Sequence, residues 1–426
     1  MEQPCTSALS KKMSALQNIS FDLKQLRQQK TKMTLPLEEL TRPRLKIAIV
    51  TETWPPEING VAHALLQLCK GLQKQGHKIL LIRPEQRQAC NDFKPHSECL
   101  VKAHCLPKYS NLQFGRPQFL KIHQAVETFT PDIIHIVTEG PLGLVAQQLA
   151  KFHKIPVSSG FHSSFQEFSR FFDLAFLLKP IQGYLRWFHN NTDLTCVPSR
   201  GTAQALNQFG VTCPLAVVGR GVDPDTFSPK WRSPDLRYAW GVSNETRVML
   251  YVGRLSPEKE IDVLIKTYFV LRQVRQQDIR LVVVGDGPDR TRLQQLNQDG
   301  SIVFAGSLTG EKLSTAYASA DVFCFASQVE TFGNVVLEAM ASGLPVIAYD
   351  YACANLHVQH GETGWLSRLG HQQGLIQQML GLPDLQRLQQ MGAQARKKAE
   401  KVGWQYPVRQ FEQALYSLVQ HQEYRI

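Results

Sequence analysis

Two pairs of charged residues in the second half of the chain have the types and spacing to act on a phosphorylated ligand. Arg254 and Lys259 follow the apolar run 248–252. A fixed Arg and Lys can stabilise negative charge that develops on a leaving phosphate. The guanidinium can bind two phosphate oxygens, whereas the ammonium acts as a point charge. The alternative is that both are surface cations beside Glu258 and Glu260, where exposed ion pairs contribute little.

Glu330 and Glu338 form the other pair, in the segment 329–338, VETFGNVVLE, which follows a predicted strand and opens a predicted helix. The free N–H groups at such a helix start can bind an anion. A loop carboxylate at 330 can accept hydrogen bonds from sugar hydroxyls, and a carboxylate about two turns later can reach a ribose diol. The alternative is a helix N-terminal charge worth about 0.3–1 kcal/mol at Glu330 and an exposed helix residue at Glu338.

Candidates in the first half also follow predicted strands. Gly60 lies in TWPPEINGVA, a loop that leads into a helix and lets N–H groups approach a phosphate. His162 lies at the carboxyl end of a strand, where α/β domains bind ligands. Glu139 follows the preceding strand and is a candidate for the acceptor side. The alternatives are that a single glycine serves any tight turn and that a lone histidine is structural.

The elements that must position these residues alternate between strands and helices in two series. This rhythm predicts two doubly wound α/β domains with parallel sheets, whose strand ends face one cleft. Helices such as 61–75 and 143–152 separate the strands. The predicted strands are 45–50, 78–83, 132–137, 156–160 and 193–197 in the first series, and 248–252, 280–284, 302–304, 322–325 and 345–348 in the second.

The chain divides into five predicted segments. Residues 1–44 are predicted to be a basic tail with three interpretations: a disordered segment, a basic amphipathic helix on a membrane over residues 14–30, or a mis-assigned start over the first 32 residues. The first α/β domain spans 45–215, the linker 216–245 and the second domain 246–405. We expect the C-terminal helix, in 406–426, to cross back onto the first domain.

Composition predicts a cytoplasmic protein with an anionic partner. No apolar stretch of about 18 residues or secretory signal occurs, and the nine cysteines lack a CxxC pair. Of the net charge of +11, residues 1–230 supply +10, from 27 Lys and Arg against 17 Asp and Glu. This excess suggests a membrane surface, a phospholipid or a nucleic acid; ordinary solubility is the alternative. We expect no nucleic-acid partner, because no known nucleic-acid-binding module is present.

The segment 329–348, together with the Gly-Arg-Leu…Lys pattern at 253–259, resembles the signature of the family-4 retaining glycosyltransferases. The resemblance covers roughly residues 45–410 and implies the two-domain GT-B fold, a UDP- or GDP-sugar donor and a hexosyltransferase that requires no cofactor. It gives each candidate a role. Glu330 and His162 contact the donor sugar, Glu338 the ribose, Arg254 and Lys259 the diphosphate, Gly60 a donor phosphate, and the amides near Phe332, Gly333 and Asn334 the sugar and diphosphate.

Two departures from the family pattern concern the donor. Glu260 stands where the family usually has glycine, so its carboxylate must point away from the phosphates. Residues 350–355, DYACAN, replace the usual Gly-Gly pair, which puts donor identity in doubt. We predict no metal site, because Asp223 and Asp225 match Asp-x-Asp within GRGVDPDTF, a pattern typical of a turn.

The acceptor is expected to be a membrane glycerolipid. The Asn-Gly, Glu-Gly-Pro-Leu-Gly and Gly-Phe-His forms resemble a branch of lipid-directed mannosyl-, glucosyl- and sulfoquinovosyl-transferases. The stretch 165–187 interleaves aromatic and basic residues, which suits a peripheral contact on the inner face of the cell membrane; an ordinary packed helix is the alternative. Two other functions stay open, a non-catalytic sugar-nucleotide or glycan-binding protein and a glycosyltransferase with a soluble small-molecule or protein acceptor.

Overall fold

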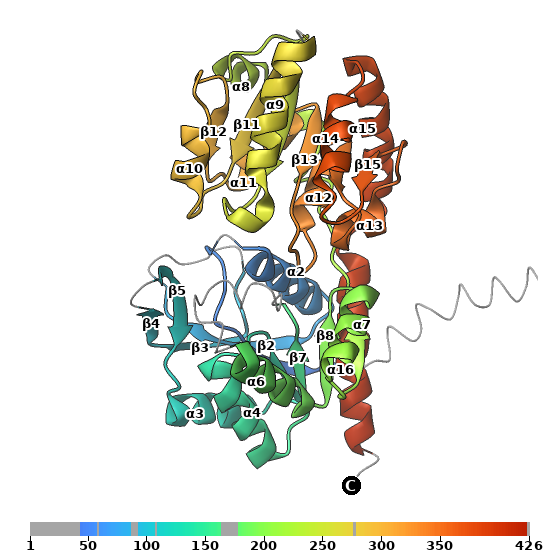
Figure 1. The fold of residues 1–426 in the computed structure, drawn as a ribbon. Coiled ribbons are helices and arrows are strands. Elements are labelled where there is room, and N and C mark those ends of the chain that lie inside the picture. Colours follow the sequence, from blue (N-terminus) through green and yellow to red (C-terminus); the bar gives the residue numbers. More distant parts are fainter. Residues whose placement is uncertain are drawn as a thin grey trace, which may run out of the picture. The chain divides into compact units, whose positions relative to one another are not determined.

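The structure, a computed structural model, describes residues 43–57, 59–86, 93–106, 109–162, 178–275 and 278–423. Two parallel sheets with helices on both faces make up the described chain (Figure 1). The predicted tail therefore lies almost entirely outside the described residues, and so does most of the aromatic and basic stretch 165–187.

The first sheet has seven parallel strands in the order β3-β2-β1-β6-β7-β8-β9. Its central strands are short apolar runs buried on both faces, as expected when helices cover a parallel sheet. The strands are β1 (Lys46–Val50), β2 (Lys78–Pro84), β3 (Ser97–Val101), β6 (Ile133–Ile136), β7 (Val157–Gly160), β8 (Leu194–Val197) and β9 (Leu215–Val217), and a separate antiparallel pair consists of β4 (Ala103–Leu106) and β5 (Tyr109–Gly115).

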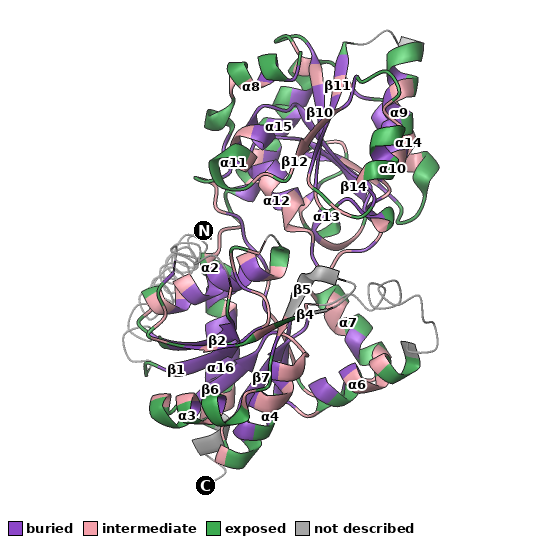
Figure 2. Ribbon diagram, turned by 90° about the vertical axis from the view of Figure 1, so that its left-hand side faces the viewer, coloured by how far each residue is buried: buried purple, intermediate pink, exposed green. Residues whose placement is uncertain are grey.

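The helices of the first domain alternate with its strands. They include α2 (Gly60–Lys74), α3 (Phe119–Phe129), α4 (Pro141–His153), α6 (Leu178–Asn190) and α7 (Arg200–Phe209). The predicted helices at 61–75 and 143–152 correspond to α2 and α4. Figure 2 shows buried strands in the middle and helices that expose their outer faces.

The second sheet has six strands in the order β12-β11-β10-β13-β14-β15. The strands are β10 (Arg247–Val252), β11 (Ile279–Val284), β12 (Val303–Gly306), β13 (Val322–Phe325), β14 (Val346–Tyr349) and β15 (Gly364–Ser367). Its helices are α8 (Pro234–Ala239), α9 (Ile261–Arg275), α10 (Arg290–Gln295), α11 (Gly310–Ala318), α12 (Asn334–Ala341), α13 (Ala352–His357), α14 (Gln372–Leu380) and α15 (Leu385–Ala399), with two short 3-10 turns, η2 (Pro229–Trp231) and η3 (Pro257–Lys259). The prediction of two doubly wound α/β domains is confirmed.

The last helix, α16 (Gln405–Glu423), follows the second domain in sequence but packs on the first sheet (Figure 1). Nε2 of His77 lies 2.8 Å from Oε1 of Glu412, and both side chains are buried. The ring of Phe411 meets His135 of β6 edge to face at 4.7 Å. Gly71 of α2 is needed at this contact, because a Cβ there would lie 2.3 Å from Val408.

Strand order fixes where each domain can hold a ligand. In both sheets the order reverses beside the first strand, between β1 and β6 in one and between β10 and β13 in the other. Loops at the carboxyl ends of strands diverge at such a switch point and leave room for a ligand. The candidates Gly60, Glu139, Arg254 and Glu330 all lie on or just beyond the loops that follow these four strands.

Candidate functional site

Lys259 and Glu330 lie side by side at the switch point of the second sheet. Nζ of Lys259 donates to Oε1 of Glu330 at 2.6 Å, and also to the carbonyl of Val329 at 2.9 Å and Oγ of Ser327 at 3.2 Å. Their side chains are only 10% and 17% exposed. The three N–H groups of the ammonium therefore each have an acceptor. The cation and the carboxylate are held together where solvent has little access.

Glu330 is positioned by hydrogen bonds to its side chain and backbone, in a loop that needs a glycine at position 333. Its second partner is Oγ of Ser327, at 2.8 Å, and its backbone carbonyl accepts from the hydroxyl of Tyr351 at 2.9 Å. Gly333 has φ +89°, a left-handed conformation that favours glycine. Helix α12 begins at the next residue, Asn334, and Gly333 supplies no side-chain cap, which leaves the first N–H groups available to an anion.

Glu338 lies on α12 and is held by a tyrosine. The hydroxyl of Tyr317 donates to Oε2 of Glu338 at 3.0 Å. Burial raises the pKa of this carboxyl to about 7, although the tyrosine hydrogen bond lowers it. A carboxyl with a pKa near neutrality, accepting one hydrogen bond, keeps capacity to accept another from a ligand hydroxyl.

Arg254 is exposed in the loop after β10, and this loop rests on the turn that follows β11. The carbonyl of Arg254 accepts from the hydroxyl of Tyr251 at 2.9 Å. Any Cβ at Gly285 would lie 1.9 Å from the carbonyl of Gly253, and one at Gly287 would lie 2.2 Å from that of Leu255. The glycines of the Gly285–Pro288 turn therefore let it press against the loop that carries Arg254.

Glu260 points into a cluster of polar side chains. It accepts hydrogen bonds from the hydroxyl of Tyr349 and from Nε2 of Gln372, both at 2.6 Å, and from Nε2 of Gln328. Its φ of +46° lies in the left-handed region, where the usual glycine of the family would be relaxed. The carboxylate is thus occupied by neutral donors from three separate segments.

The second departure from the family pattern, residues 350–355, packs against the loop that carries Glu330. The amide of Cys353 donates to the carbonyl of Phe332 at 2.8 Å, and the thiol is buried. Ala352 has φ +49°, a left-handed conformation without glycine. A small cavity here is lined by Glu330, Phe332, Tyr349, Tyr351, Cys353 and neighbours.

In the first domain, Gly60 is the first residue of α2. The side chain of Asn59 caps this helix by accepting from the amide of Ala62 at 2.8 Å. Nothing lies within 4 Å of the position that a Cβ on Gly60 would take. The protein itself therefore does not require a glycine at position 60 for space.

His162 follows β7 and contacts both domains. Its backbone carbonyl accepts from Oγ1 of Thr331, next to Glu330, at 2.9 Å. Its Nδ1 lies 2.9 Å from Nη2 of Arg220, a buried residue after β9. Sequence reasoning missed Arg220 and Thr331; the first lies in the predicted linker, beside the Asp-x-Asp motif, and the second lies inside the signature segment.

Glu52 is another residue that the sequence analysis missed. It follows β1, and its Oε1 accepts from the amide of Leu142 at the start of α4, at 3.1 Å. Burial raises its pKa to about 7, against this backbone hydrogen bond, and the nearby Glu139 adds to the rise. Glu139 lies 3.2 Å from Nε2 of His189. Glu52, the first charged residue beyond β1, could have been found by the rule that identified Glu139 after β6.

The Asp-x-Asp pair is tied up in a local turn. Asp223 accepts from the amide of Asp225 at 3.0 Å and from the hydroxyl of Thr226 at 2.6 Å. Within the described residues, the group with the residue types and spacing of metal ligands is His123, Glu127 and His153, whose ligand atoms lie within 4.8 Å of one another. These residues belong to α3 and α4 and not to the loops at either switch point.

Comparisons with known proteins cover both domains. Residues 233–398 match the model "Glycosyl transferases group 1", and residues 58–226 match "Glycosyltransferase Family 4". A GDP-mannose-dependent alpha-mannosyltransferase of Mycobacterium tuberculosis is 32% identical over 76% of this chain and 84% of its own length. The sulfoquinovosyl transferase SQD2 of Arabidopsis thaliana is 29% identical over 86% and 72%. An alpha-monoglucosyldiacylglycerol synthase of Streptococcus pneumoniae is 28% identical over 72% and 71%.

Solved structures share the fold. A sucrose-phosphate synthase from Thermosynechococcus elongatus aligns with a TM-score of 0.71 at 21% identity, over 88% of this chain and 99% of its own. HepE from Anabaena, in complex with UDP and glucose, aligns with a TM-score of 0.68 at 20% identity, over 88% and 100%. Among the described residues, no helix combines the length and apolar character needed to cross a membrane.

Proposed function

The chain belongs to family 4 of the glycosyltransferases, and on that premise we propose that it transfers a hexose from a UDP- or GDP-sugar to a membrane glycerolipid, with retention of the anomeric configuration. It is a hexosyltransferase by the names of its relatives. The observation that carries the proposal is the contact between Lys259 and Glu330 at the switch point of the second sheet, with Arg254 on the adjoining loop.

The donor binds, in this proposal, with its diphosphate at Arg254, Lys259 and the N-terminal amides of α12, near Phe332, Gly333 and Asn334. Glu338 accepts hydrogen bonds from the ribose, and Glu330 accepts them from hydroxyls of the sugar. From the first domain, Gly60 lets the start of α2 approach a donor phosphate, and His162 contacts the transferred sugar. The loops after β1, β10 and β13 carry Gly60, Arg254, Lys259 and Glu330 at or near a switch point, His162 follows the neighbouring strand β7, and Glu338 lies on the helix that follows the Glu330 loop; this placement supports these roles.

The transfer step needs stabilisation of the leaving diphosphate more than a protein base. The acceptor oxygen bonds to the anomeric carbon on the face from which the diphosphate leaves, while the bond from that carbon to the phosphate oxygen breaks. The acceptor proton passes to the leaving phosphate, so the atoms and charges balance. Arg254 and Lys259 stabilise the charge that develops there, and we propose no metal ion or other cofactor in this step.

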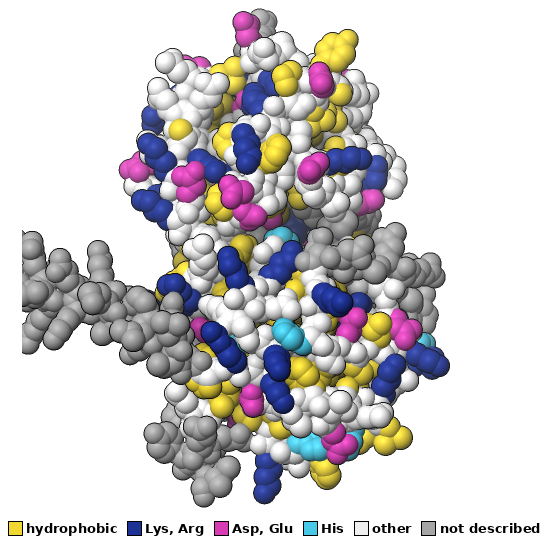
Figure 3. Space-filling view, turned by 180° about the vertical axis from the view of Figure 1, so that it is seen from behind, with side chains coloured by type: hydrophobic (Ala, Val, Ile, Leu, Met, Phe, Trp, Pro, Cys, Tyr) yellow, Lys and Arg dark blue, Asp and Glu magenta, His cyan; other side chains and the backbone are white. Residues whose placement is uncertain are grey.

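The lipid acceptor is supported by the relatives and by the surface of the first domain. Two relatives are named for sulfoquinovosyl transfer and for the synthesis of alpha-monoglucosyldiacylglycerol. In Figure 3 the lower part of the molecule, which is the first domain, carries more Lys and Arg than Asp and Glu. On α6, Trp187 is 44% exposed, the cations Lys179 and Arg186 of the same helix are exposed as well, and Phe188 packs in the core. We therefore propose a peripheral enzyme on the cytoplasmic face of the membrane.

A donor screen tests the proposal. The full chain would be incubated with UDP-glucose or GDP-mannose, with and without vesicles that contain diacylglycerol, and release of nucleoside diphosphate would be measured. We expect release with one donor, stimulated by the vesicles, and a glycosylated lipid of α configuration. Binding of a donor without any release would support the non-catalytic alternative, and release stimulated by a soluble acceptor alone would contradict the lipid assignment.

A further inference from the structure

Arg220 is a buried cation of the first domain whose only close side-chain partner among the described residues is a histidine. The residue is 7% exposed and lies after β9. Nη2 donates to Nδ1 of His162 at 2.9 Å, and Nη1 makes a longer contact with the carbonyl of Gly219 at 3.4 Å. Among the described residues, the close side-chain contact of the Arg220 guanidinium is therefore with the neutral ring of His162 and not with a carboxylate.

This contact determines where the proton of His162 resides. A guanidinium has only N–H donors, so Nδ1 of His162 must accept with its lone pair. The proton of the neutral ring is then on Nε2. An imidazolium would place two N–H groups against each other, and burial together with the charge of Arg220 holds the pKa of His162 well below its ordinary value.

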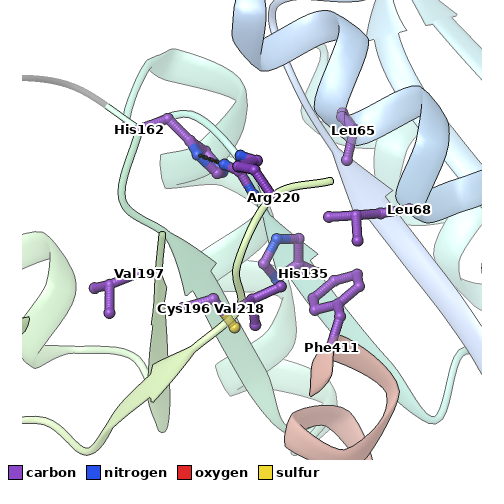
Figure 4. Close-up of a pocket in the computed structure, with 9 residues that line it drawn as sticks. All are labelled: Leu65, Leu68, His135, His162, Cys196, Val197, Val218, Arg220 and Phe411. Carbon is purple, nitrogen blue, oxygen red and sulfur yellow. Dashed lines mark hydrogen bonds between the residues drawn. The ribbon is translucent and has the colours of Figure 1, made fainter. Parts of the chain in front are cut away.

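The other ring nitrogen is positioned by Gly160. A Cβ at residue 160 would lie 2.4 Å from Nε2 of His162, so any other side chain would displace the ring. The described residues offer Nε2 no hydrogen-bond acceptor. Figure 4 shows the ring directed toward Arg220, and both residues line a cavity together with His135, Cys196 and Phe411.

We propose that Arg220 is a positioning residue, which fixes the ring and the tautomer of His162 so that Nε2–H faces the transferred sugar as a neutral donor. The assignment of the sugar as the ligand rests on the proposed function. The hydrogen bond from Thr331 to the carbonyl of His162 ties this strand end to the loop of Glu330, which contacts the same sugar in that proposal. The permanent charge of Arg220 thereby determines which nitrogen of the neutral His162 ring carries the N–H group.

Four titratable or charged groups of the described residues surround the His162 ring. They are Arg220 from the segment after β9, His135 from β6, His189 from α6 and Cys196 from β8. Burial lowers the pKa of His135 to about 3 and keeps it neutral, with its Nδ1 2.9 Å from Oγ of Ser158. Arg220 is therefore the group among these that carries a fixed charge toward His162.

A double-mutant cycle tests the positioning role through turnover. Arg220→Met and Arg220→Lys would be compared in the wild-type and the His162→Gln backgrounds, with thermal unfolding as a check on folding. We expect Arg220→Met to lower kcat about 10- to 100-fold in the wild type, and Arg220→Lys, which can still donate to Nδ1, to restore most of it. In the His162→Gln background the Met substitution should change kcat by less than about threefold, because coupled residues are non-additive. Equal losses in the two backgrounds would overturn the proposal.

A measurement that does not depend on turnover keeps this proposal separate from the proposed function. In the full chain labelled with 15N-histidine, the nitrogens of His162 are identified by the signals that disappear in His162→Gln. We expect a protonated Nε2 and an unprotonated Nδ1 from pH 6 to pH 8, and a population with the proton on Nδ1 in Arg220→Met. A proton on Nδ1 in the wild type would overturn the proposal, whereas the expected signals in a protein that processes no donor would contradict only the proposed function.

Discussion

Lys259 and Glu330 are 71 residues apart in sequence, yet Nζ of one lies 2.6 Å from Oε1 of the other. The cation proposed for the diphosphate and the carboxylate proposed for the sugar are thus partners of each other. In this proposal the two partners bind two parts of one donor, which links recognition of the phosphate to recognition of the sugar.

Replacement of Lys259 by alanine should lower turnover far more than it lowers stability. Removal of one group that stabilises developing charge costs about 100- to 1000-fold in rate, while Glu330 keeps its hydrogen bond to Ser327. Steady-state kinetics and thermal unfolding would be measured together. Lys266→Ala is the matched control, because Lys266 is 68% exposed and pairs with Asp262 on nearby α9. Near wild-type turnover in Lys259→Ala would remove this residue from the site.

Gly60→Ala should leave folding unchanged and weaken donor binding. The helix start has space for a Cβ, so a rise in KM of about tenfold would report the close approach of a phosphate to the backbone. Gly183→Ala is the control, since a Cβ at Gly183 on α6 also meets nothing within 4 Å. Equal kinetics for both variants and the wild type would argue against a phosphate contact at Gly60.

Glu260→Gly restores the usual residue of the family and should still destabilise the protein. Relief of the left-handed conformation is worth about 1–2 kcal/mol, but the carboxylate accepts three hydrogen bonds, and hydrogen bonds to a charged group contribute about 1.5–3 kcal/mol each. Denaturant unfolding would measure the net loss, with Glu260→Gln as a control that keeps an acceptor and the same backbone. A more stable Glu260→Gly would show that the cluster contributes little.

Glu52 should make stability decrease as pH rises from about 4.5 to 7. The folded protein holds the proton of this carboxyl up to about pH 7, whereas the ordinary pKa is 4.5, so in this window the folded state binds more protons than the unfolded state. Glu52→Gln cannot ionise, and its amide oxygen can still accept from Leu142. We expect it to gain on the order of 1–3 kcal/mol over the wild type between pH 5 and pH 8, measured by urea unfolding. Glu311→Gln, at an exposed site on α11, should show no such gain, and parallel curves for Glu52→Gln and the wild type would refute the expectation.

Membrane binding should be reversible and sensitive to salt. Each basic residue near an anionic surface contributes about 1 kcal/mol, and salt screens this attraction. Co-sedimentation with anionic vesicles at low salt should exceed that with neutral vesicles and fall at high salt. Trp187→Ala should weaken binding, with exposed Trp231→Ala of the second domain as the control. Equal, negligible pelleting with both kinds of vesicle would remove the membrane proposal.

The clearest strands in the sequence are those with apolar runs. Buried strands such as β1 (KIAIV), β2 (KILLIRP) and β10 (RVMLYV) each contain at least four consecutive apolar residues, which indicates a parallel sheet covered on both faces. The prediction omitted β3, β9 and β15, which are short edge strands with mixed residues. Their conformation depends on pairing with neighbours far away in sequence, which single-sequence patterns do not record.

The candidate residues were found where motif and strand end coincide, as at Glu330 and His162. The partners of these residues were not found, because Arg220 lies 58 positions from His162 and neither residue signals the other. Whether Glu260 points away from the phosphates also depended on donors from three other segments. The residues with functional side chains could thus be predicted from local sequence. The hydrogen bonds that orient those side chains could be identified only in the three-dimensional structure.

The return of α16 to the first sheet has a consequence for how the protein is made. During synthesis the first domain leaves the ribosome well before the second. Its residues His77, His135 and Gly71 nevertheless remain uncovered until α16 has been made. In the folded protein they contact Glu412, Phe411 and Val408, respectively. Until α16 has been synthesised, the part of that domain which α16 covers stays exposed. The domain that starts first is completed last, so a ribosome that stalls in the second domain leaves an incomplete first domain as well.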